Sequence, residues 1–175
     1  MKDDFSPNLT FEITDSKLFL QKLLEEYNDF DKEYLNPRYA LNCALNSWHL
    51  TDWTYQEFFK DDSRFQDSTE KTESGSFKIT GLTKYQNLLI EICEELKYMR
   101  LISNGAKHCV LNKKVTQKTG TKIGDYMNGD FNRFDYDTTR FVIENENGEK
   151  IGFERALLKT IEFWKSFIDN PKSYT

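Results

Sequence analysis

The sequence predicts a mainly α fold: about four helices in a bundle, with a small antiparallel β element before the last helix. Apolar residues recur at the helical period over four long stretches. An Asn147-Gly148 pair lies between two short segments of strand character, which is typical of a β-hairpin. A chain of 175 residues without repeats is expected to form one domain over 1–175.

The first helix is expected from a cap at Thr14, Asp15 or Ser16 to about Leu35. Asn36-Pro37 should separate it from a second helix over 37–59, because proline disfavours a helical residue before it but suits a first helical turn. The third and fourth helices are expected over about 83–105 and 153–169, and Pro171 ends the last one.

Two polar segments separate these helices. Residues 60–80 are rich in Ser and Thr and are expected to form a long loop, with a short ordered piece around Phe77 and Ile79. The second, 109–137, is expected to be basic strand and loop, followed by a hairpin near 139–153.

Composition favours a protein of a reducing compartment. The 14 Phe, 9 Tyr and 3 Trp can fill a core without disulfides or a structural metal. Three cysteines, with no C-x-x-C pair, argue against a disulfide framework. The start of the chain lacks an apolar signal core, and no run reaches the ~18 apolar residues of a membrane span, so a cytoplasmic location is expected.

The net charge of −5 argues against a nucleic-acid binder that uses its whole surface. Residues 107–124, however, contain five lysines and no acid. These lysines can contact RNA, or they can simply keep an edge strand from pairing with other chains. They are Lys107, Lys113, Lys114, Lys118 and Lys122.

No strong catalytic or cofactor motif is present. Thr119-Gly120-Thr121-Lys122 lacks the glycine spacing of a phosphate loop, and two histidines are too few for a histidine-rich metal site. No cofactor or metal is therefore expected.

The sharpest candidate site is Arg100, Asn104 and His108. Residues four apart share a helix face, provided that the helix continues through Gly105. The histidine can then exchange protons near neutral pH, and the arginine can hold a phosphate. In the alternative interpretation Asn104-Gly105 ends the helix, and the basic residues only complement its negative end.

The segment Met99 to His108 resembles the Arg…His segment of HEPN-type small helical ribonucleases and toxins of prokaryotic defence systems. The resemblance implies a dimeric helical bundle with a metal-independent ribonuclease site. His108 would be the general acid or base, Arg100 would bind phosphate, Asn104 would orient the histidine and Lys107 would contact the RNA backbone. The spacing between Arg100 and His108 is longer here than in that family.

A second cluster, His49 and Asp52, lies three residues apart on the second helix between Trp48 and Trp53. It can form an acid/base pair, but the expected role is a buried histidine bonded to a carboxylate. Carboxylates on two helices also suggest a third class, Mg²⁺-dependent all-α nucleotide pyrophosphohydrolases, although the order of the acidic motifs is reversed here. They are Glu25, Glu26, Asp29, Glu91, Glu94 and Glu95.

Because no motif dominates, the sequence favours a non-catalytic interaction or structural domain, acting as a homodimer or with a protein partner. A HEPN-like ribonuclease acting on RNA is the alternative.

Overall fold

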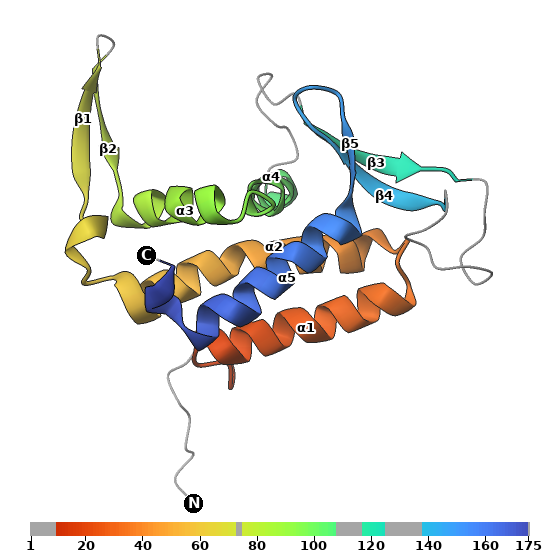
Figure 1. Ribbon diagram of the computed structural model, residues 1–175, viewed down its shortest axis with the longest axis horizontal. Helices are drawn as coiled ribbons and strands as arrows, with labels where there is room; N and C mark the ends of the chain where they lie inside the picture. The colour runs from red at the N-terminus through yellow and green to blue at the C-terminus, as the bar shows by residue number, and fades with distance from the viewer. Residues whose placement is uncertain (1–9, 73–74, 108–116, 125–137, 175) are drawn as a thin grey trace, which may run out of the picture.

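The computed structural model describes residues 10–72, 75–107, 117–124 and 138–174 (Figure 1). These residues form a mainly α fold with small antiparallel β elements, which confirms the predicted class. The five α-helices are α1 (Ser16–Lys32), α2 (Pro37–Thr54), α3 (Gly81–Ile92), α4 (Leu96–Lys107) and α5 (Phe153–Asp169). The strands are β1 (Ser68–Thr72), β2 (Gly75–Ile79), β3 (Lys118–Lys122), β4 (Arg140–Glu144) and β5 (Lys150–Gly152).

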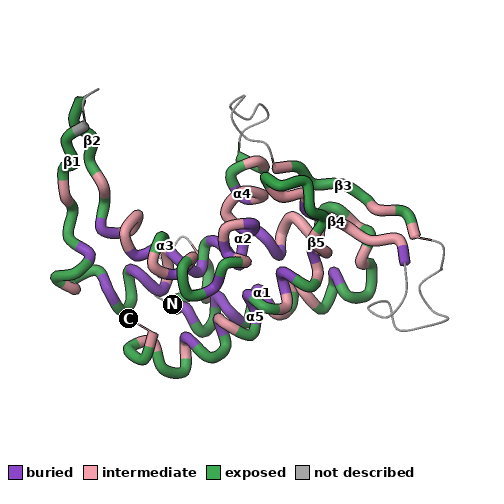
Figure 2. Tube along the Cα trace, turned by 45° about the horizontal axis from the view of Figure 1, so that its top comes forward, coloured by how far each residue is buried: buried purple, intermediate pink, exposed green. Residues whose placement is uncertain are grey.

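Helices α1, α2 and α5 lie side by side and enclose most of the core (Figures 1 and 2). Asp15 caps α1 by accepting from the Leu18 backbone N–H, and Asn36 caps α2 before Pro37, as expected from the sequence. The predicted helix over 37–59 is confirmed, with its last turn, Tyr55–Phe59, wound as a π-helix. The largest fully buried side chain, Trp164 of α5, donates its indole N–H to the Ser47 carbonyl oxygen at 3.0 Å.

The single helix expected over 83–105 is in fact two helices, α3 and α4. The prediction of a continuous helix is wrong at residues 93–95, which separate them. Cys93 leaves helical geometry (φ −130°, ψ 93°) without any Pro or Gly to mark the break. In Figure 1, α3 runs across the view whereas α4 points along it. The turn between them is held by ion pairs, because Glu94 binds Lys97 and Glu95 binds Lys159 of α5.

The prediction of a long loop over 60–80 is also wrong for most of this segment. A 3₁₀ turn (Ser63–Phe65) is followed by the antiparallel β1–β2 hairpin, which includes the ordered piece expected at Phe77 and Ile79. The hairpin extends away from the helices and is exposed over most of its length (Figure 2). Asp67 closes its base by accepting from Lys78 and from the Gly81 backbone N–H.

The second sheet has the order β3-β4-β5, and all of its pairs are antiparallel. The hairpin predicted near 139–153 is confirmed: Gly148 has φ +79°, and the Asn145 side chain accepts from the backbone N–H groups of Asn147 and Glu149. Strand β5 leads without a gap into α5, so the sheet is joined directly to the core helix.

Gly81, the first residue of α3, lies against the backbone of Phe65 in the preceding 3₁₀ turn. We therefore expect Gly81→Ala to destabilise the fold. A Cβ added there would lie 1.7 Å from the Phe65 carbonyl oxygen, so the backbone would have to move. We expect urea unfolding to report a loss of roughly 1–3 kcal/mol, as for overpacked cores. Gly120→Ala is the control, because nothing lies within 4 Å of its added Cβ, and it should change stability by less than about 0.5 kcal/mol. Equal effects would contradict this account.

Candidate functional site

Helix α4 carries the residues of the sharpest sequence candidate. It continues through Gly105 to Lys107, so the alternative in which Asn104-Gly105 ends the helix is wrong. Arg100 and Asn104 therefore share one face, as the four-residue spacing requires. Asn104 and Lys107 are exposed. His108, Lys113 and Lys114 lie outside the described residues, so the imidazole of this candidate is not placed.

Arg100 packs against an aromatic ring. Its guanidinium carbon lies 5.6 Å from the centroid of the Trp48 ring, and the residue is half-buried. Such a cation–π contact stabilises by about 0.5–1 kcal/mol, which gives this arginine a packing role between α4 and α2. The contact is with Trp48, the residue before His49, and not with His49 or Asp52 themselves.

The His49 and Asp52 pair differs from its expected form. His49 is exposed rather than buried, because it lies on the outer side of α2 next to the buried Trp48, so that prediction is wrong. Asp52 is half-buried and accepts from the Gln86 side-chain amide of α3 at 3.3 Å. Burial raises the pKa of the Asp52 carboxyl, and the positive charge of His49 opposes that rise.

The raised pKa of Asp52 predicts a pH-dependent effect of Asp52→Asn. A carboxyl whose pKa is higher in the folded chain stabilises folding when protonated, and that contribution is lost as the pH rises through the folded pKa. The ionised group therefore costs stability at neutral pH. We expect Asp52→Asn to raise the Tm by a few degrees at pH 7 and to have little effect below about pH 3, where the carboxyl is protonated in both the folded and the unfolded chain.

The control is Glu25→Gln, which makes the same charge change at an exposed residue in the middle of α1 and should shift the Tm little at either pH. A Tm gain for Asp52→Asn that is equal at both pH values would rule out the electrostatic origin.

At least three of the six carboxylates suggested for Mg²⁺ bind other side chains. Glu26 accepts from Asn42 of α2, and Glu94 and Glu95 are ion-paired with lysines. Within the described part of the chain, no group of three or more His, Cys, Asp or Glu side chains is arranged to hold a metal ion. The geometry therefore gives no support to the pyrophosphohydrolase alternative.

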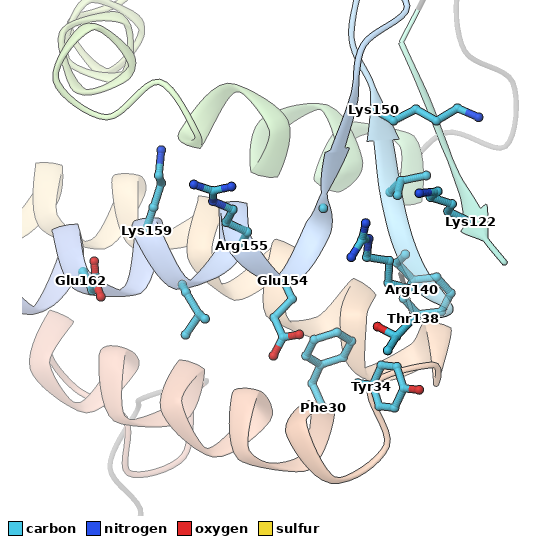
Figure 3. A pocket seen from close by; sticks show the side chains of 14 residues that line it. Phe30, Tyr34, Lys122, Thr138, Arg140, Lys150, Glu154, Arg155, Lys159 and Glu162 are labelled. Atoms are coloured by element: carbon cyan, nitrogen blue, oxygen red, sulfur yellow. The ribbon is translucent and has the colours of Figure 1, made fainter. Parts of the chain in front are cut away.

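Sequence reasoning missed a basic groove of about 840 Å³ between the three-stranded sheet and α5 (Figure 3). Two acids, Glu154 and Glu162, also line it. Because the whole chain carries −5, this local excess of positive charge sets the groove apart from the average surface. The five cations that line it are Lys122, Arg140, Lys150, Arg155 and Lys159.

The strand register explains why the sheet wall is basic. Lys122 lies opposite Arg140, and residues directly opposite one another project from the same face of a sheet. Lys150 shares that face, because its partner Glu144 lies four residues from Arg140 on the same strand. The other face packs on the helices and carries Phe141, Ile143 and Ile151.

Two pairs of like charges meet in this groove. Lys122 and Arg140 are direct cross-strand neighbours, an arrangement that by itself destabilises a sheet. Arg155 and Lys159 are four residues apart on α5, where like charges also repel, and Arg155 tends to lower the pKa of Lys159. The ion pair with Glu95 outweighs this effect and raises the pKa of Lys159.

The position of α5 adds to the positive potential. The helix begins at Phe153, and Gly152, Glu154 and Arg155 at its amino end line the groove. The aligned peptide dipoles of its 17 residues place partial positive charge there. Elsewhere in the groove, Phe30 and Tyr34, from the end of α1 and the turn after it, supply aromatic surface.

The sequence contained part of the signal for this groove. Lys118, Gly120 and Lys122 alternate with Thr, as expected for one face of a strand, and Arg155 and Lys159 have the spacing of one helix face. The basic residues of the strand and of the helix can therefore each be recognised in the sequence. Of the three singled-out lysines that the structure describes, Lys107, Lys118 and Lys122, only Lys122 lines the groove. Its neighbours on β4, β5 and α5 come together only through the pairing of the strands and the packing of the helix.

Comparison with known proteins found no match to a family model, a curated protein or a solved structure. Among the described helices, none has the length and apolar character needed to cross a membrane.

Proposed function

We propose that this chain is a non-catalytic binding domain and that its groove between the sheet and α5 binds the phosphate backbone of RNA. The observation that carries the proposal is the convergence of five cationic residues, from β3, β4, β5 and α5, on one groove of an acidic protein. A phosphate chain whose charges are neutralised by such cations releases its condensed counterions. Binding energy is therefore available in this groove.

Charge reversal in the groove tests the proposal. Lys150 and Arg155 are exposed on opposite walls. Because Lys150 lies opposite Glu144 on β4, circular dichroism and Tm must first show that Lys150→Glu keeps its fold. We expect Lys150→Glu and Arg155→Glu each to weaken binding of a fluorescein-labelled 12-nucleotide RNA by about tenfold in anisotropy titrations at low salt. The slope of log K against log salt should fall by about 0.7 for each phosphate that the variant no longer neutralises.

Lys165→Glu is the matched control, because it makes the same charge change on an exposed residue of α5 outside the groove. Its effect should be small. If Lys165→Glu weakens binding as much as the groove variants do, or if the natural chain does not bind RNA at about 50 mM salt, the proposal fails.

A metal-independent ribonuclease of HEPN type is the second candidate function. The continuation of α4 through Gly105 favours it, because Arg100 and Asn104 share a face and the helix leads towards His108. The half-buried stacking of Arg100 on Trp48 counts against it, since a phosphate would have to compete with that contact.

Incubation of total RNA in EDTA with the natural chain and with His108→Ala separates the two functions. A binding domain leaves the RNA intact with both chains. Cleavage by the natural chain that His108→Ala abolishes would establish the ribonuclease, whereas cleavage that persists in the variant would indicate a contaminating nuclease.

A further inference from the structure

We infer that Glu95 restrains the groove by holding Lys159, and that an RNA phosphate has to displace the Glu95 carboxylate before it binds this lysine. The inference rests on the proposed RNA-binding function and names a contact that regulates the same groove. Three observations carry it: the ion pair between the two side chains, the place of Lys159 in the groove, and the contacts that hold Glu95 at the α3–α4 turn.

The ion pair joins two elements that are far apart in the chain. Lys159 of α5 donates to Glu95 Oε1, and the two atoms are 2.5 Å apart. A lysine ammonium binds carboxylate and phosphate oxygens alike, through charge-assisted hydrogen bonds. A phosphate that approached Lys159 while this contact persisted would lie beside a like charge, which disfavours its binding. The Glu95 carboxylate is therefore an intramolecular competitor for the phosphate.

Lys159 lines the groove, whereas Glu95 does not. Figure 3 shows Arg155 and Lys159 projecting from α5 towards the same side. The Lys159 side chain is 55 % exposed and its four-carbon stem is flexible, so it can turn from Glu95 to a ligand without a movement of the backbone. Release of the pair therefore adds a cation to the groove beside Arg155.

Glu95 is held from its own side of the contact. Its Oε2 atom accepts from the Cys93 thiol at 3.8 Å, and its backbone carbonyl accepts from the Tyr98 backbone N–H at 3.1 Å. These contacts keep the carboxylate next to α5 when no ligand is bound. An ion pair with one exposed partner is nevertheless weak, and its loss changes an equilibrium by about fivefold at most. Glu95 therefore lowers the RNA affinity of the groove but does not close it.

Glu95→Gln tests the inference on the full chain, because it removes the charge of this side chain and nearly keeps its shape. We expect this variant to bind the fluorescein-labelled 12-nucleotide RNA about two- to fivefold more tightly than the natural chain in anisotropy titrations at low salt. Glu94→Gln is the matched control. It makes the same charge change one residue earlier, but Glu94 pairs with Lys97, which does not line the groove, so its gain should stay below about 1.5-fold.

A double-mutant cycle separates release of the lysine from a change in net charge. A Lys159→Gln chain has no ammonium to release at this position. Glu95→Gln should therefore give no larger gain in that chain than Glu94→Gln gives in the natural chain.

Hydrogen exchange on the natural chain is a second readout that needs no variant. The backbone N–H groups of Leu96 and Tyr98 bond to carbonyl oxygens of the α3–α4 turn. We expect them to exchange about two- to fivefold faster with RNA bound, because the turn then loses its tie to α5.

Three results would overturn the inference. They are equal gains for Glu95→Gln and Glu94→Gln, a gain of Glu95→Gln that persists in the Lys159→Gln chain, and exchange at the turn that is unchanged or slower with RNA. In each case Lys150→Glu and Arg155→Glu would still weaken binding, and the proposed function would stand. Absence of RNA binding by every chain would remove both. Circular dichroism and Tm identify a variant that has lost its fold, and hydrogen exchange on the natural chain then decides the outcome.

Discussion

The contact between α5 and α2 is the constraint on which the rest of the structure depends. Trp164 is fully buried, and its indole N–H is satisfied by the Ser47 carbonyl oxygen. One turn earlier on α5, Thr160 accepts at 3.0 Å from the Ser47 hydroxyl, and both residues are fully buried. An unpaired polar group at this depth would cost about 1–3 kcal/mol, so these bonds determine where α5 lies along α2.

That contact also positions the candidate interface. Because β5 continues directly into α5, a helix held on the core holds the sheet as well. The exposed side of α5 then presents Arg155 and Lys159 opposite the basic face of the sheet, and Lys159 is further tied to Glu95 at the α3–α4 turn. The groove is thus built on rigid elements rather than on a loop, which is the arrangement that keeps charged side chains in register with a ligand.

The sequence predicted the helices correctly where capping residues, turn residues and apolar periodicity all indicated the same structure. The caps at Asp15 and Asn36, the Asn147-Gly148 turn and the apolar periodicity of α2 and α5 each act over a few residues. The break at Cys93 was not readable, because it has no Pro or Gly and is held by carboxylates that pair with lysines, one of them 64 residues away. The exposure of His49 was missed for a similar reason: a histidine between two tryptophans looks buried until the face of α2 that meets α4 is known.

The sequence by itself determined the fold class, the positions of most helix ends and the β4–β5 hairpin, because these features follow from periodicity and from the conformations that Asn, Pro and Gly allow. It also marked Arg100 and Asn104 as residues of one helix face. Only the tertiary structure decided that Arg100 stacks on Trp48 and that cations from β3, β4, β5 and α5 surround one groove. Such groupings depend on strand register and helix packing between segments far apart in the chain, and no local pattern encodes either of them.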